Sequence, residues 1–380
     1  MENSKSVLVI GNGFDVALGR PTKYSNFYES EFCPKRFPAP LIGYLNGCVN
    51  QGDAQFLRWM DIESAIQKYA QSRGKGEVHD GDSYTEDEKK LIEKIYGFNL
   101  APIPHRQYDF SAGEEDLLKQ MQNVGKIGYE RTNTMPYWNF DFADLPYDEF
   151  VNSSPQERDI KALSAIESGL ANYLNSIDCN APKDKQNLAY QLLLRFWRES
   201  SNGEIYSFNY TSLEPLIRTF DTYSVDLSLR INYMHGSLSE DHVILGAGKE
   251  INERGYGEWA FLKKSNDNDY RPPMLVEAMK NASKVIVYGF SFSEIDIQYF
   301  NYLFNYMLEG GKSKIVKIFD YGKKGIRSIK NNIKNIDDLQ TLGVNVIDVE
   351  GKDASVFDCC LEDPVKTEEK INKLRNMIIR

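Results

Sequence analysis

The sequence predicts an α/β protein in which a Rossmann-like parallel sheet is interrupted by a large, mainly helical insertion. Three observations lead to this fold class. A β-branched run at residues 7–10 ends in a glycine, which is typical of a buried parallel strand. Strand patterns are then missing until about residue 204. Beyond that point strand-like runs alternate with helical patterns, as expected for a parallel sheet with helical crossovers.

The strand-like runs divide the chain into two predicted domains. They lie at residues 7–10, 204–208, 229–234, 243–245, 284–288, 314–319 and 344–349. The clearest helical pattern between them spans residues 297–308. We therefore expect a sheet domain formed by residues 1–31 and 201–380, and a helical insertion formed by residues 32–200.

The insertion is predicted to contain at least two helices. Apolar side chains recur at helical spacing at Trp59, Ile62, Ile66 and Tyr69. A second helix has a defined start, because Ser154 and Glu157 match a capping box and Pro155 occupies the first helical position. Glu63 shares a face with Trp59 and Ile66, so its carboxylate is expected to be partly buried and to need a partner. We interpret Glu63 as a structural residue that forms a salt bridge or hydrogen bond, rather than as a catalytic one.

The composition limits the environment and partners of the protein. Hydrophobic residues make up 41% of the chain and charged residues 26%, which is ordinary for a globular protein. No apolar stretch approaches the roughly 20 residues of a membrane span, so a cytoplasmic protein with no membrane partner is expected. The formal net charge is −10 and no basic stripe stands out, so nucleic acid is not expected to be its main partner.

The cysteines and histidines form no recognisable metal site. Five cysteines contain no C-x-x-C pair, and four histidines show neither H-x-x-x-H nor H-E-x-x-H spacing. The sequence therefore predicts no bound metal. The odd number of cysteines, without a secretion signal, indicates reduced thiols.

The first motif that carries chemistry follows the first predicted strand. Gly11 and Gly13 flank Asn12 directly before a probable helix, where glycines let a backbone approach a ligand and direct N–H groups toward phosphate. The third glycine of a dinucleotide fingerprint is replaced by Val16, which disfavours a hydride-transferring dehydrogenase. Asp15 has two interpretations: a first-turn carboxylate that stabilises the helix, or a contact to ribose hydroxyls. It is not expected to face phosphates, because the charges would repel.

The same stretch resembles two known families. It is similar to the nucleotide loop of sirtuins, G-A-G-I-S-x-x-x-G-I-P-D-F-R, at Gly11, Gly13, Gly19 and Pro21. It is more similar to the AbiH (abortive infection H) pattern G-N-G-F-D-x-x-x-G-x-P-T-x-Y-x-x-F, with matches that include Asn12, Asp15, Thr22 and Tyr24. A W-x-D-x-E helix, also found in AbiH proteins, is matched at residues 59–63. Membership of AbiH would imply bacterial defence against phage by growth arrest or death.

Three later motifs resemble sirtuin sites, although each alone is more often a turn or a helix cap. Residues 207–211 contain Asn209 and resemble the sirtuin T-Q-N-I-D. His235 is followed by glycine after the next strand, where sirtuins place their general base. Residues 288–296 resemble the sirtuin G-T-S loop that holds the dinucleotide, and include Gly289, Ser291 and Asp296. Ser293 and Asp296 also match a helix-capping pair.

The order of these motifs along the chain reproduces that of sirtuins, with each motif placed after a predicted strand. Open α/β sheets bind ligands at this carboxyl edge. The resemblance therefore implies NAD as the substrate and Asn209 and His235 as catalytic residues. The nucleotide-binding residues that it implies are Gly11, Asn12, Gly13, Asp15, Gly19, Pro21, Thr22, Tyr24, Gly289, Ser291 and Asp296.

The function implied is hydrolysis of the nicotinamide–ribose bond of NAD, started by a phage-derived trigger. Asn209 would orient water or ribose, and His235 would take the proton. Two departures from sirtuins, Thr211 for Asp and Tyr24 for Arg, are also compatible with a non-catalytic sensor of NAD, ADP-ribose or a related nucleotide that signals through the insertion. A toxin acting on nucleic acid is a third, weaker alternative. The sequence leaves a homo-oligomer open.

Overall fold

The computed structural model divides into two compact units. The first comprises residues 1–22, 177–242 and 268–380, and the second comprises residues 23–176 and 243–267. The residues that the structure describes are 5–35, 39–50, 62–77, 153–180, 182, 184–200, 203–220, 230–238, 242–248, 257–264, 272–292, 296–311 and 314–360.

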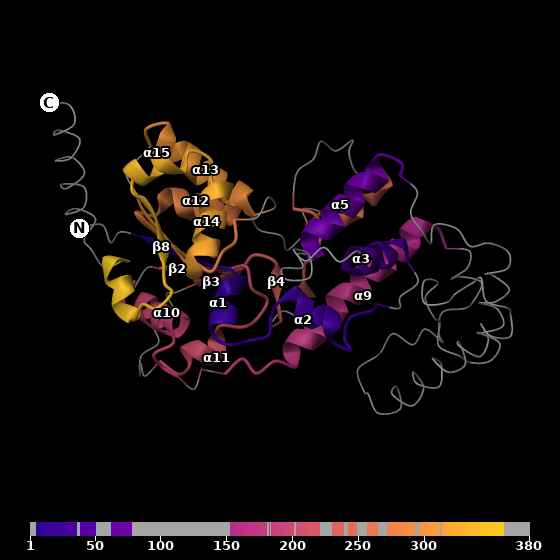
Figure 1. Ribbon diagram of the computed structural model, residues 1–380, viewed down its shortest axis with the longest axis horizontal. Helices are drawn as coiled ribbons and strands as arrows, with labels where there is room; N and C mark the ends of the chain where they lie inside the picture. Colours follow the sequence, from indigo (N-terminus) through magenta and orange to yellow (C-terminus); the bar gives the residue numbers. More distant parts are fainter. Residues whose placement is uncertain are drawn as a thin grey trace. The chain divides into compact units, whose positions relative to one another are not determined.

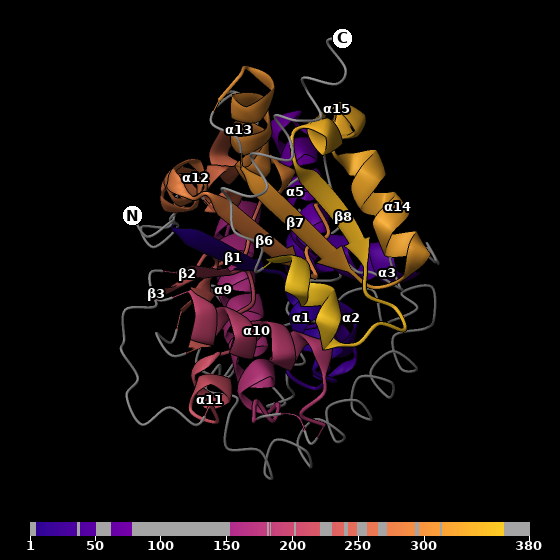
Figure 2. The ribbon, with the colours of Figure 1, turned by 90° about the vertical axis from the view of Figure 1, so that its left-hand side faces the viewer.

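The first unit is built on a six-stranded parallel sheet (Figure 2). Its strands are β1 (Ser6–Ile10), β2 (Glu204–Ser207), β3 (Arg230–Tyr233), β6 (Lys284–Tyr288), β7 (Ile315–Asp320) and β8 (Val344–Asp348). They lie in the order β3-β2-β1-β6-β7-β8, and every neighbouring pair is parallel. Six of the predicted strands are thereby confirmed. The run predicted at residues 243–245 is not in this sheet: β5 spans only His242–Val243, and β4 (Gly236–Ser237) is equally short.

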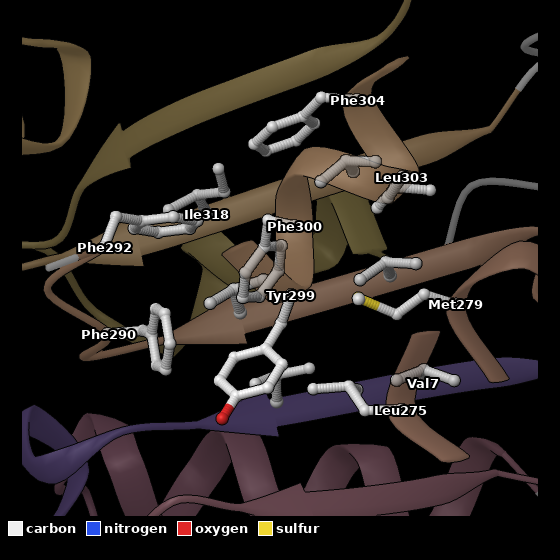
Figure 3. Close-up of a cluster of buried hydrophobic side chains, with 14 of the residues drawn as sticks. Val7, Leu275, Met279, Phe290, Phe292, Tyr299, Phe300, Leu303, Phe304 and Ile318 are labelled. Carbon is white, nitrogen blue, oxygen red and sulfur yellow. The ribbon is translucent and has the colours of Figure 1, made fainter. Parts of the chain in front are cut away.

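Helices cover both faces of this sheet because side chains alternate between the faces along each strand. On one face Val7 and Ile318 pack under α12 (Pro272–Asn281) and α13 (Ile297–Leu308), as Figure 3 shows. Residues of α14 (Gly322–Asn332) and α15 (Ile336–Thr341) complete that cluster. The other face is covered by α1 (Asn12–Ala17), α10 (Leu188–Glu199), α11 (Glu214–Ile217) and η7 (Ala354–Cys360). The helix predicted at residues 297–308 is confirmed as α13.

Helix α10 belongs to the first unit, although the predicted boundaries assigned it to the insertion. Its buried face includes Leu192, Leu193 and Phe196, which pack in one cluster with Leu8 and Ile205 of the sheet. An amphipathic pattern predicts that a helix has a buried face but not which element covers it. The sequence therefore predicted this helix but not that it packs on the sheet of the first unit.

The second unit is helical in its described part. It contains α2 (Tyr24–Glu29), α3 (Pro40–Asn50), α5 (Ile62–Gly74), α9 (Pro155–Asn175) and η5 (Gly257–Leu262). Figure 1 shows α3 beside α5 and α9, against which it packs. The predicted capping box of α9 is confirmed: the Glu157 backbone N–H donates to the Ser154 hydroxyl, and the Ser154 N–H donates to the Glu157 carboxylate. No helix in the described part of the chain is long and apolar enough to cross a membrane.

Two buried carboxylates of the second unit have identified partners. The Lys264 ammonium lies 2.6 Å from Glu63 Oε1, which confirms the prediction that Glu63 forms a structural ion pair. The carboxylate of Asp159 accepts hydrogen bonds from the Leu41 backbone N–H at 2.8 Å, from Trp259 Nε1 at 2.9 Å and from the Tyr69 hydroxyl. These contacts bring α3, α5, α9 and η5 together around one buried acid. Trp59 and Asp61 of the predicted W-x-D-x-E pattern lie outside the described residues.

Candidate functional site

The predicted motifs of the first unit converge on the carboxyl edge of its sheet. Gly11, Gly289 and the residues that follow Ser207 and Tyr233 all lie where parallel strands end. The strand order reverses at the centre, since the chain builds outward from β1 to β2 and β3 and then returns to place β6 on the other side of β1. Such a switch point, outside the carboxyl ends of the strands, is where open α/β sheets bind ligands. Tyr24 lies in the second unit instead.

The glycines of the loop after β1 (Gly11 and Gly13) pack directly against Gly289 in the loop after β6. The Gly11 N–H donates to the Tyr288 carbonyl at 3.0 Å, and the Gly13 N–H donates to the Gly289 carbonyl at 2.9 Å. A Cβ on Gly13 would lie 2.6 Å from Gly289 Cα, and one on Gly289 would lie 2.5 Å from Phe14 N. The prediction that these N–H groups point at phosphate is therefore wrong for Gly11 and Gly13, because the neighbouring strand and loop accept both.

Gly289→Ala is expected to destabilise the protein by about 1–3 kcal/mol more than Gly19→Ala, because a side chain must displace closely packed backbone. Both glycines have positive φ, +63° at Gly289 and +81° at Gly19, so both substitutions carry the strain of a left-handed residue. Only Gly19 has nothing within 4 Å of the added carbon. Urea denaturation of the two variants measures the difference, and equal losses would show that the loops separate without cost.

A buried ion pair connects three segments beneath these loops. Arg20 Nη1 donates to Asp15 Oδ1 at 2.7 Å, and the Thr211 hydroxyl donates to Asp15 Oδ2 at 2.6 Å. Arg20 Nη2 also donates to the Cys179 carbonyl at 2.6 Å. Burial raises the pKa of Asp15, while Arg20 and Thr211 oppose that shift. Both carboxylate oxygens are used within the protein, so the structure supports a positioning role for Asp15 in place of the ribose contact considered from the sequence.

Contacts within residues 12–22 give a structural role to Asn12, Gly19 and Thr22. The Thr22 hydroxyl donates to Asn12 Oδ1 at 2.7 Å, which closes residues 12–22 into a loop. Gly19 provides the left-handed turn within this loop, and Pro21 follows it. The Arg20 N–H donates to the Asp15 carbonyl at 3.0 Å. The G-N-G-F-D-x-x-x-G-x-P-T pattern thus describes one self-supporting loop at the end of β1.

Asn209 follows β2 in a loop whose backbone is fixed on several sides. Its own N–H donates to the Ser207 hydroxyl at 3.1 Å, and the next carbonyl, of Tyr210, accepts from the Leu238 N–H at 3.2 Å. The preceding Phe208 N–H donates to the Ile10 carbonyl at 2.9 Å. Asn209 is only 4% exposed. Neither Nδ2 nor Oδ1 has a hydrogen-bond partner within the described residues, so the backbone is held while the two buried amide atoms are unpaired.

His235 lies in the same neighbourhood as Asn209. It follows β3, is 4% exposed, and its ring meets the Phe208 ring edge-on at a centroid distance of 5.2 Å. The Tyr210 ring is 6.3 Å away. The residues on both sides of Asn209 therefore pack near the imidazole, which places the Asn209 backbone and His235 at neighbouring strand ends.

The loop after β6 holds the remaining predicted residues. Ser291 is exposed, and Asp296 is the N-cap residue of α13 but makes no capping hydrogen bond with its side chain. Ser293, its predicted capping partner, lies outside the described residues. Between them Phe292 has φ +52°, and its buried ring packs against Phe290 and Phe300 (Figure 3). This strained residue was missed, since only an unusual φ identifies it.

Asp320 is a further carboxylate of this edge that the sequence analysis did not single out. It ends β7, directly after the Phe319 carbonyl that accepts from the Gly289 N–H. Burial, with a smaller contribution from the nearby charge of Asp348, raises the pKa of Asp320 from 3.8 to about 6. The folded protein therefore binds this proton at a higher pH than the unfolded chain does.

Asp320→Asn is expected to be more stable than the wild type at pH 7, by up to about 2 kcal/mol, because it removes a buried charge. The advantage should shrink as the pH falls from about 6 to about 4, where Asp320 in the folded wild type becomes protonated. Urea denaturation across this range tests the difference, with Asp337→Asn at an exposed position as the control. A constant difference between wild type and Asp320→Asn would contradict the assignment.

The described residues were expected to hold no metal ion, and their potential ligands are scattered. They contain no group of three or more histidine, cysteine, aspartate or glutamate side chains that could hold an ion. The expectation of a metal-free protein stays a prediction, since His79 and His105 lie outside the described residues.

Comparison with known proteins gives one match. A family model described as bacteriophage abortive infection AbiH matches residues 7–317. No curated protein and no solved structure matches the chain.

Proposed function

The chain belongs to the AbiH family of bacteriophage abortive infection, and we propose that it acts in this defence by hydrolysing the nicotinamide–ribose bond of NAD. The strand order supports a dinucleotide ligand. Numbered within the sheet, it is 3-2-1-4-5-6, the order of Rossmann folds, which bind dinucleotides where that order reverses. The motifs that resemble sirtuin sites surround this point.

The single observation that carries the proposal is the buried side-chain amide of Asn209, which has no partner in the described residues. A buried polar side chain without a partner is costly, so such groups are rare unless a ligand or water completes them. Asn209 lies at the carboxyl edge with both polar atoms unpaired in the described residues, and His235 packs against the adjacent Phe208 and Tyr210. This arrangement suits a substrate-binding residue beside a proton acceptor.

The chemistry requires few groups. Nicotinamide leaves from C1′ of the ribose as a neutral molecule and takes the bonding electron pair to its ring nitrogen. Water attacks C1′, and the proton that it loses passes to His235. The products are ADP-ribose and nicotinamide. Because Asp15 is enclosed by Arg20 and Thr211, its part in this reaction is to hold the loops in place.

Binding without turnover is the second candidate function. It is favoured by Thr211, which occupies the place of the sirtuin aspartate and whose hydroxyl donates to Asp15. This residue is therefore committed to the protein framework. A sensor of NAD or ADP-ribose would use the same edge of the sheet and need no proton acceptor.

Chromatography of NAD incubated with the purified protein tests the proposal. Equal amounts of ADP-ribose and nicotinamide are expected, either directly or after addition of phage-infected lysate that supplies the trigger. The same lysate without the protein corrects for other enzymes that consume NAD. Binding of NAD by calorimetry without any product, in the presence of the trigger, would favour the sensor, and absence of both would contradict a nucleotide site.

A further inference from the structure

The Asn209 side chain has no hydrogen-bond partner in the described residues, whereas several other groups of its loop are paired. The Ser207 hydroxyl accepts from the Asn209 N–H and donates to the Asn209 carbonyl, both at 3.1 Å. Leu213 is fixed next, since its N–H donates to the Tyr233 hydroxyl at 3.0 Å. The amide Nδ2 and Oδ1 have no partner in the described residues, and Asn209 is 4% exposed. The described residues therefore leave two buried polar atoms that a group from outside them would have to complete.

The donor and acceptor of the Asn209 amide limit which groups can form hydrogen bonds with both of its polar atoms. An amide offers a donor and an acceptor side by side in one plane. A carboxylate supplies only acceptors and leaves Oδ1 unpaired, and one hydroxyl or water reaches both atoms only at bent angles. A planar group with an acceptor beside a donor satisfies both atoms with straight hydrogen bonds.

We infer that Asn209 is a specificity-determining residue that recognises such a planar donor–acceptor edge. Asn209 directly follows Phe208, whose ring packs against His235 and, at a ring distance of 4.7 Å, against Phe290. The inference rests on the proposed function for its ligand. NAD carries this edge twice: in the carboxamide of nicotinamide and in the amino edge of adenine, which asparagine side chains pair with in DNA recognition.

Calorimetry with three dinucleotides distinguishes the two sources. Nicotinic acid adenine dinucleotide replaces the carboxamide by a carboxylate, and nicotinamide hypoxanthine dinucleotide replaces the adenine amino edge. One of them is expected to bind on the order of 10- to 100-fold more weakly than NAD, since a buried partner is left unpaired. The same preference should be lost in Asn209→Leu, which removes the amide at similar volume.

Thermal denaturation without ligand gives an independent measure. Asn209→Leu is expected to melt at the same temperature as the wild type or higher, because it removes polar atoms that have no partner in the described chain. Asn187→Leu is the matched control. Asn187 caps α10 by accepting from the Ala189 and Tyr190 N–H groups, and its Nδ2 donates to the Ala17 carbonyl at 2.6 Å. This variant should melt several degrees lower.

The possible results separate this inference from the proposed function. Equal binding of all three dinucleotides, or a fall in melting temperature for Asn209→Leu as large as that for Asn187→Leu, would overturn the role of Asn209 even if NAD is hydrolysed. A preference that depends on Asn209, without any hydrolysis, would support the inference and contradict the enzymatic proposal. Absence of binding to all three probes would overturn the inference.

Discussion

Replacing Arg20 with methionine is expected to lower the free energy of unfolding by about 3–5 kcal/mol, because it leaves the Asp15 carboxylate buried without its cation. Arg20 and Asp15 are both almost fully enclosed, and their atoms lie 2.7 Å apart. Methionine keeps much of the apolar volume of the arginine stem, so the loss reports on the charge. Asp15 also accepts from Thr211, so the loops that carry Asn12 and Asn209 should loosen together.

An exposed ion pair in the same unit provides the control for this measurement. Arg218 and Glu214 lie 3.5 Å apart on one helical turn, with both side chains more than half exposed. Arg218→Met should therefore change the free energy of unfolding by less than about 0.5 kcal/mol. Urea denaturation at constant pH compares the two variants. Similar losses at both positions would mean that the buried pair contributes little more than a surface contact.

The parallel sheet was predictable because its strands are short apolar runs buried on both faces. Residues 7–10 and 284–288 have this pattern, and both became central strands. The edge where ligands bind followed from the same reasoning, since parallel strands all end on one side. The two partners of Asp15 were harder to predict, because Arg20 is five positions away and Thr211 is 196 positions away. No local pattern pairs residues across that distance.

The glycine motif illustrates what a local signal leaves open. Gly11 and Gly13 correctly indicated that another group lies very close to the main chain at these positions. The sequence suggested a phosphate group, whereas the structure places the Gly289 loop there. A glycine pattern specifies the need for space near the main chain, but the identity of the neighbour depends on Gly289, which lies 278 positions after Gly11.

Substitution of His235 by alanine is expected to lower kcat for NAD hydrolysis by roughly 10²- to 10⁴-fold and to change KM little, because a proton acceptor acts mainly in the transition state. His235→Gln should lose a similar factor, since an amide cannot take the proton at neutral pH. This second variant retains a polar side chain beside Phe208 and Tyr210. It therefore separates loss of the proton acceptor from loss of packing.

The double variant with Asn209→Ala tests whether the two residues act as a unit. If Asn209 holds the substrate in line with the water that His235 deprotonates, each single change already removes most of the aligned reaction. The double variant should then lose less than the product of the two single losses. Single-turnover measurements on the triggered protein, with folding checked by circular dichroism, give these factors. A folded His235→Ala protein that consumes NAD at the wild-type rate would refute the role of His235. Losses that multiply fully would instead place the two residues in independent steps.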